Sequence, residues 1–120
     1  MPTIAFAAPL LPGKTDADRE AMTACWNGNR KTEHDASRRR LGITKMAIWI
    51  QQTPGGDLAV VHLEADDLEV AGKGMATSDD PFDRWFAEHI RDVHGISVED
   101  GLPPVEQVLN FEATSLASSR

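Results

Sequence analysis

Alternating apolar and polar stretches divide the chain into a regular series of predicted elements. Residues 3–11 are almost entirely apolar and end at a Pro-Gly pair, which predicts a buried strand followed by a turn. From residue 15 or 16 to Leu41 the chain has no proline and consists mostly of good or neutral helix formers, so we expect one long helix. Gly42 supplies the stop, and three arginines precede it at the negative end of the helix dipole.

A β-hairpin and a second helix are predicted next. Residues 43–52 and 57–65 are rich in β-branched and aliphatic side chains and flank the turn sequence Thr-Pro-Gly-Gly. A short helical piece should follow and end near the glycines at 72 and 74. The second main helix starts at Asp80, a capping residue placed just before proline at the first helical position. Its apolar face follows a three-four spacing through Phe82, Trp85, Phe86, His89, Ile90 and Val93.

The remaining segments complete a βαββαβ order. Residues 97–104 are expected to be a loop, 105–113 the last strand, and 114–120 a flexible C-terminal tail. This order predicts an α+β fold of the ferredoxin-like type over residues 1–113: a four-stranded antiparallel sheet with two helices on one face. Such a fold leaves the other sheet face bare, so we expect a homodimer formed through that face.

Parity in the hairpin predicts which side chains share a face of the sheet. A two-residue or four-residue turn pairs odd positions of one strand with even positions of the other. One face then holds Ala47, Trp49, Gln51, Leu58, Val60, His62 and Glu64. The opposite face, which is apolar throughout, should pack under the helices and holds Met46, Ile48, Ile50, Ala59, Val61 and Leu63.

Composition and charge exclude several classes of function. The 120 residues suit one domain, and the formal net charge of −7 argues against binding to a nucleic acid backbone. No apolar run approaches the roughly 20 residues that span a bilayer, so no membrane contact is expected. Cys25 is the single cysteine, which rules out an intrachain disulfide and agrees with a cytoplasmic location. The sequence has no pattern typical of a metal site, a phosphate loop or a nucleophile elbow, and no cofactor is expected.

Trp49 and His62 are the strongest candidates for catalysis. A tryptophan face near an imidazole could hold an aromatic substrate and move its proton, because histidine titrates near neutral pH. Glu64, two residues from His62 on the same face, could orient the imidazole. The alternative is a dimer interface in which Trp49 is an aromatic anchor and His62 is hydrogen-bonded.

Candidate ligand-binding residues lie on the two predicted helices. His89 and Trp85 are one turn apart on the apolar face of the second helix, where a histidine is more often a satisfied core residue than a ligand. Asn29 belongs to a polar continuation of the first helix's buried stripe, together with Thr32 and Glu33. These residues would line a cavity, or the helix would overhang the sheet there.

Several segments resemble a known superfamily. Pro-Gly-Lys at 12–14, ASRRRLGI at 36–43, QQTPGGDLAVVHLEADD at 51–67 and SDDPFDRWFAEHIRDVHGI at 78–96 resemble the dimeric α/β-barrel superfamily, and most closely a family of small bacterial proteins of unknown function. The resemblance implies a ferredoxin-like fold and a homodimer whose sheets face each other. Members of the superfamily oxidise aromatic polyketides without a cofactor, degrade haem, isomerise small lactones or act under stress.

Three functions are therefore compatible with the sequence. The first is binding or transformation of a small aromatic or carbonyl compound without a metal cofactor, by a monooxygenase-like or isomerase-like protein. The second is a non-catalytic homodimeric structural or stress-related module. The third is a haem-handling protein, although the first strand offers only Phe6, Ala7 and Ala8 where the haem-degrading members have an asparagine.

Overall fold

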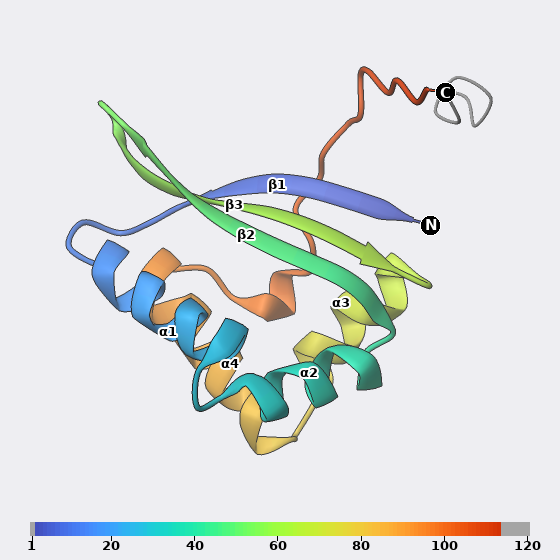
Figure 1. Ribbon diagram of the computed structural model, residues 1–120, viewed down its shortest axis with the longest axis horizontal. Coiled ribbons are helices and arrows are strands. Elements are labelled where there is room, and N and C mark those ends of the chain that lie inside the picture. Colours follow the sequence, from blue (N-terminus) through green and yellow to red (C-terminus); the bar gives the residue numbers. More distant parts are fainter. Residues whose placement is uncertain (1, 114–120) are drawn as a thin grey trace.

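Three antiparallel strands form a sheet, and four helices cover one of its faces (Figure 1). The structure is a computed structural model and describes residues 2–113. Strand order in the sheet is β1-β3-β2, so the hairpin's second strand lies in the middle. The elements in chain order are β1 (Thr3–Pro9), α1 (Thr15–Asn27), α2 (Lys31–Arg40), β2 (Ile43–Thr53), β3 (Gly56–Ala65), α3 (Leu68–Thr77), α4 (Pro81–His94) and the 3₁₀-helix η1 (Val98–Asp100).

The predicted ferredoxin-like fold, with a four-stranded sheet and two helices, is wrong. The expected last strand, residues 105–113, pairs with no strand among residues 2–113. Gly101 has a φ of +79°, and Pro103 and Pro104 follow it without backbone N–H donors; beyond them the chain runs away from the helical layer and past the sheet (Figure 1). An alternating pattern gives a segment the tendency to form a strand, but the strand exists only where its backbone finds a partner.

The predicted long helix is two helices, α1 and α2, separated at Gly28. The chain at Gly28 is extended, with φ −113° and ψ −153°. A Cβ at this position would lie 2.8 Å from the Cα of Ala24, so the close return of the chain requires glycine. Glycine is also about 1 kcal/mol less favourable than alanine within a helix. The buried stripe therefore ends at the break, and Asn29, Thr32 and Glu33 are exposed.

The hairpin has the predicted parity. Thr53 pairs with Gly56, which leaves a two-residue turn. Trp49 pairs with Val60 and Ala47 pairs with His62, so the tryptophan and the histidine share a face as expected. On the opposite face, beneath the helices, the three central residues Ala59, Val61 and Leu63 are buried.

Helix α4 begins and ends as predicted, whereas α3 continues past its expected stop. The Asp80 side chain accepts hydrogen bonds from the backbone N–H groups of Phe82 and Asp83, and Gly95 takes the left-handed conformation with φ +71°. Helix α3 runs through Gly72 and Gly74. A Cβ at Gly74 would lie 2.7 Å from Cδ2 of Leu41, so this glycine allows close packing and does not end the helix.

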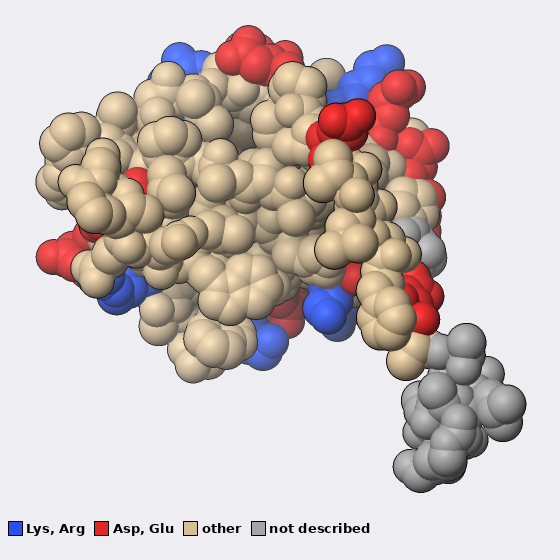
Figure 2. All heavy atoms as spheres, turned by 90° about the horizontal axis from the view of Figure 1, so that it is seen from above, with Lys and Arg blue, Asp and Glu red and all other residues tan. Residues whose placement is uncertain are grey.

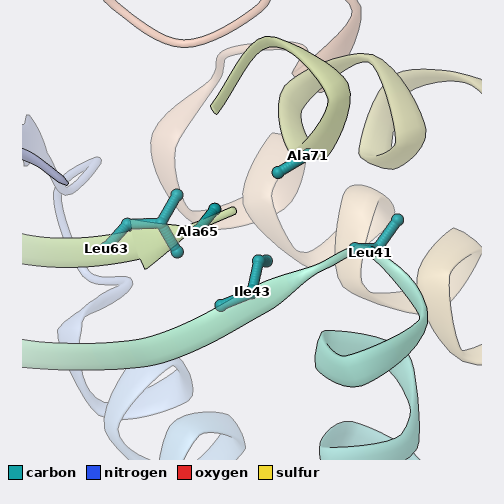
Figure 3. Close-up of a cluster of buried hydrophobic side chains, with 5 residues drawn as sticks. All are labelled: Leu41, Ile43, Leu63, Ala65 and Ala71. Atoms are coloured by element: carbon teal, nitrogen blue, oxygen red, sulfur yellow. The ribbon is translucent and has the colours of Figure 1, made fainter. Parts of the chain in front are cut away.

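The core consists of two apolar clusters on the helical side of the sheet. Figure 3 shows the first, where the start of β2, the end of β3 and α3 converge; it contains Leu41, Ile43, Leu63, Ala65 and Ala71. The second is built from Cys25, Phe82 and Phe86, between α1 and α4. Among the described residues, no helix combines the length and apolar character needed to cross a bilayer.

The sheet face away from the helices has an uncharged centre. Figure 2 looks onto this face and shows Lys, Arg, Asp and Glu gathered around its rim. The Trp49 side chain lies on it and is 57% exposed. Near one end, His62 Nε2 and Glu64 Oε2 are 3.5 Å apart. We call this surface the outer face.

Candidate active site

A mostly apolar cavity lies between the inner face of the sheet and the helices. Its volume is about 110 Å³, the same order as the roughly 150 Å³ that holds a benzene molecule in an engineered cavity. The strands contribute Phe6, Ala8, Met46 and Ala59, among others, and α3 and α4 contribute Met75, Phe86 and Ile90. Residues from 96 to 103, including η1, close one side of the cavity. An apolar chamber of this size suits a small organic molecule.

Asp18 and His89 form a largely buried pair in the cavity wall, in which the His89 side chain is 10% exposed. Asp18 lies in the first turn of α1 and is 3% exposed, and His89 lies on the apolar face of α4. Nε2 of His89 is 2.8 Å from Oδ1 of Asp18. The second carboxylate oxygen, Oδ2, is buried and has no hydrogen-bond partner among residues 2–113. A buried acceptor without a donor costs roughly 1–3 kcal/mol, so the fold keeps this oxygen at the expense of stability.

The pair has the arrangement of a general base with its orienting group. A carboxylate oxygen only accepts hydrogen bonds, so Nε2 of His89 is the donor to Asp18. The proton on Nε2 leaves the lone pair on the other ring nitrogen, Nδ1, which is the form that accepts a proton. A carboxylate that fixes the tautomer and orientation of an imidazole in this way recurs in enzymes that transfer protons.

An aromatic cluster holds the His89 ring in place. Trp85 stacks on it with ring centroids 5.7 Å apart and planes 17° from parallel. The guanidinium of Arg30 lies over the Trp85 ring, with its central carbon 4.0 Å from the ring centroid. Trp85 contacts the histidine and not the cavity, so the predicted ligand-binding residue has the geometry of a positioning residue.

A buried cation lies just beyond the cavity wall. Arg38 is 6% exposed, and burial lowers the pKa of its guanidinium. Its Nη1 lies 3.6 Å from the sulfur of Met46 and 3.8 Å from that of Met75, and its guanidinium carbon lies 4.7 Å from the Phe86 ring centroid. These three neighbours all line the cavity. In the sequence, Arg38 is one of three consecutive arginines whose place at the negative end of the helix dipole already explains them.

The predicted site residues are divided between the two faces of the sheet. Trp49, His62 and Glu64 lie on the outer face, with the sheet between them and His89. Asn29 is exposed in the turn between α1 and α2. The structure thus brings Trp49 and His62 onto one surface, as expected, but does not bring them to the cavity.

Asp18 is the site residue that sequence reasoning missed. An acidic residue in the first turn of a helix has an ordinary explanation, because it interacts favourably with the helix dipole there. A signal was present in the spacing, because Asp18, Met22 and Cys25 follow one another at intervals of four and three residues. That spacing places Asp18 on the buried stripe of α1, where a carboxylate needs a partner.

A second, wider hollow of about 490 Å³ runs along the free edge of β2 beside α1. Trp26, Trp49 and His34 are among its lining residues. Burial lowers the pKa of His34, although its hydrogen bond to Asp35 acts in the opposite direction. This hollow has no buried side-chain polar atom left without a partner, so it lacks the feature that distinguishes the cavity.

Metal ligation and relationships to other proteins add no further constraint. Within residues 2–113, no three His, Cys, Asp or Glu side chains gather in a way that could hold a metal ion. The resemblance to the dimeric α/β-barrel superfamily and the haem-handling reading both stay predictions. Comparison of the chain with protein-family models, with curated proteins and with solved structures gives no match.

Proposed function

We propose that the protein binds a small, mostly apolar molecule in the cavity, held by a hydrogen bond from the molecule to Asp18. The observation that carries this proposal is the unpartnered Oδ2 of Asp18 in the wall of a mostly apolar chamber. A ligand with a hydroxyl or N–H group would give this oxygen its missing donor while its apolar body fills the cavity. A phenol-like compound has both properties.

Proton transfer is the chemistry that the site supports. His89, oriented by Asp18, would take a proton at Nδ1 from a carbon next to a carbonyl group of the ligand, while the ligand's hydroxyl or N–H donates to Asp18. An apolar ligand in the cavity would displace water from the pair, which would strengthen electrostatic interactions there. This mechanism needs no metal ion, in keeping with the cofactor-free activity expected from the sequence.

Two neighbouring alanines of β1 allow the proposal to be tested by filling the cavity. Ala8 is buried and lines the cavity, whereas Ala7 is exposed on the outer face. Ala8→Leu is expected to occupy the space and weaken phenol binding at least about tenfold, since it removes apolar contacts worth roughly 1.5–3 kcal/mol. Ala7→Leu is the matched control and should bind phenol like the wild type. Titration followed by two-dimensional NMR measures both; equal binding by the two variants would place the ligand elsewhere.

We also propose that the chain forms a homodimer through the outer face, the basis of the structural-module reading. Its support is that Trp49 is 57% exposed on the outer face, whose charged side chains gather around the rim (Figure 2). Aromatic side chains are enriched in the buried centres of interfaces, and charged side chains are depleted there. The exposed apolar residues Val108, Leu109 and Phe111 after η1 offer additional surface for a partner.

Trp49→Lys is expected to dissociate such a dimer. The substitution removes an aromatic anchor and places two like charges at the interface, which together should weaken association by at least about 2 kcal/mol, or roughly thirtyfold. Native mass spectrometry and light scattering over a range of concentrations measure the change. Trp26→Lys changes an exposed tryptophan of α1; it is the control and should leave the dimer intact. A wild-type chain that remains monomeric at high concentration excludes the dimer.

A further inference from the structure

Arg38 is a buried cation that no carboxylate among residues 2–113 pairs with directly. A guanidinium has five N–H donors, and burying it destabilises a protein unless these donors form hydrogen bonds to strong acceptors. Within the described part of the chain, the oxygen to which Arg38 donates a hydrogen bond is Oγ of Ser37, 2.9 Å from Nη2. Nη1 faces two methionine sulfurs, which are weak acceptors, and Nε is buried with no partner.

The nearby carboxylate does not satisfy Arg38, because it is already engaged. Asp83 accepts hydrogen bonds from Ser37, Ser78 and Arg40. Arg39 and Arg40 also lie in the last turn of α2. These two cations already interact with the negative end of the helix dipole, so Arg38 is not needed for that purpose. Burying Arg38 therefore destabilises the fold, and neither Asp83 nor the helix dipole accounts for a buried charge at this position.

A ligand in the neighbouring cavity would explain why the fold keeps this buried charge. Met46, Met75 and Phe86 form the layer between the guanidinium and the cavity, and methionine side chains change rotamer at little cost. Asp18 belongs to α1 and Met75 to α3, and these helices lie at opposite ends of the helical layer (Figure 1). The cavity therefore extends from an acid–base pair at one end toward a cation with unused donors at the other.

We infer that the cavity's ligand is a small organic carboxylate, whose anionic group is bound by Arg38 when the methionine sulfurs move aside. This inference rests on the proposed binding function and names the class of molecule. A carboxylate matches the fork of a guanidinium and supplies the strong acceptors that Arg38 lacks. The protein's net charge of −7 repels anions at long range, so binding an anion requires a local cation of this kind.

The test compares 4-hydroxybenzoate with its neutral analogue 4-hydroxybenzamide on the full chain, with phenol as a third probe. The two compounds have nearly the same shape and the same hydroxyl for Asp18, and they differ in the anionic group. Calorimetric titration at pH 7 is expected to give about 10- to 100-fold tighter binding of the acid, the range typical of hydrogen bonds to a charged group. Arg38→Met should remove this preference, and Arg39→Met, which changes an exposed arginine, should keep it.

A second measurement uses the wild-type protein, so it does not require that the Arg38→Met variant folds. The Nε–H resonance of Arg38 in protein labelled with ¹⁵N-arginine is expected to shift when the acid binds and to stay in place when the amide binds. Equal affinity for acid and amide, or a preference that survives in Arg38→Met, overturns the inference but leaves the proposed function in place if phenol still binds. If none of the three compounds binds, the proposed function fails and the inference fails with it.

Discussion

Asp83→Ala is expected to destabilise the protein by about 3–5 kcal/mol, the loss typical when one partner is removed from a buried charged network. Asp83 is 4% exposed and lies in the first turn of α4. Its carboxylate accepts hydrogen bonds from Ser37 in α2, from Ser78 at the end of α3 and from Arg40, whose Nη2 lies 2.7 Å from Oδ2. One side chain therefore joins three helices, and its loss also removes the nearest negative charge from the buried Arg38.

Urea unfolding followed by circular dichroism measures the loss. Asp92→Ala is the matched control, because Asp92 is an exposed carboxylate of the same helix that pairs with Lys14 at 3.1 Å. An exposed pair of this kind contributes roughly 0–1 kcal/mol. If Asp83→Ala costs no more than the control, the three helices are joined by their apolar contacts alone.

Acidification should act through the same carboxylate. Burial acts to raise the pKa of Asp83, but the hydrogen bonds from Ser37, Ser78 and Arg40 outweigh it and hold the pKa below its usual value. A carboxyl group with a depressed folded pKa stabilises the fold above its unfolded pKa of about 3.9 and loses that contribution as pH falls through the folded value. The difference in unfolding free energy between wild type and Asp83→Ala should therefore shrink below about pH 4.

The parts of the fold that follow from local rules were predictable from the sequence. The hairpin's parity followed from its turn, and the bounds of α4 followed from Asp80, Pro81 and Gly95, which act on their immediate neighbours. The break at Gly28 was not visible, because a single glycine is tolerated within many helices and the close approach to Ala24 depends on how the chain returns. Residues 105–113 had a strand-like pattern, but a pattern does not provide a partner strand.

The candidate site was only half predictable for a related reason. His89 was identified because a histidine on an apolar face requires an explanation, and the structure provides one in Asp18, 71 positions away along the chain. Arg38 and Asp18 each had an ordinary local explanation, as a helix-end cation and a first-turn anion. Their burial depends on which face of each helix meets the sheet, and that became visible only once the helices were placed.

Replacing both Asp18 and His89 with leucine is expected to leave the protein as stable as the wild type or more stable, and to weaken phenol binding about 100-fold. Each single substitution leaves the other polar side chain buried without its partner, at a cost of roughly 1–3 kcal/mol. The double substitution removes both groups and the unpartnered Oδ2, and fills their space with apolar atoms. Stability gained together with binding lost is what a pair retained for function should show.

The matched control is the histidine–carboxylate pair of the outer face, His62 and Glu64. Replacing both with leucine removes the same chemical groups from the opposite side of the sheet, so phenol binding should be unchanged. This comparison also decides between the two histidines that the sequence offered as candidates. If the outer-face variant loses phenol and the Asp18→Leu/His89→Leu variant keeps it, the site lies with Trp49 and His62, and the buried pair only links α1 to α4.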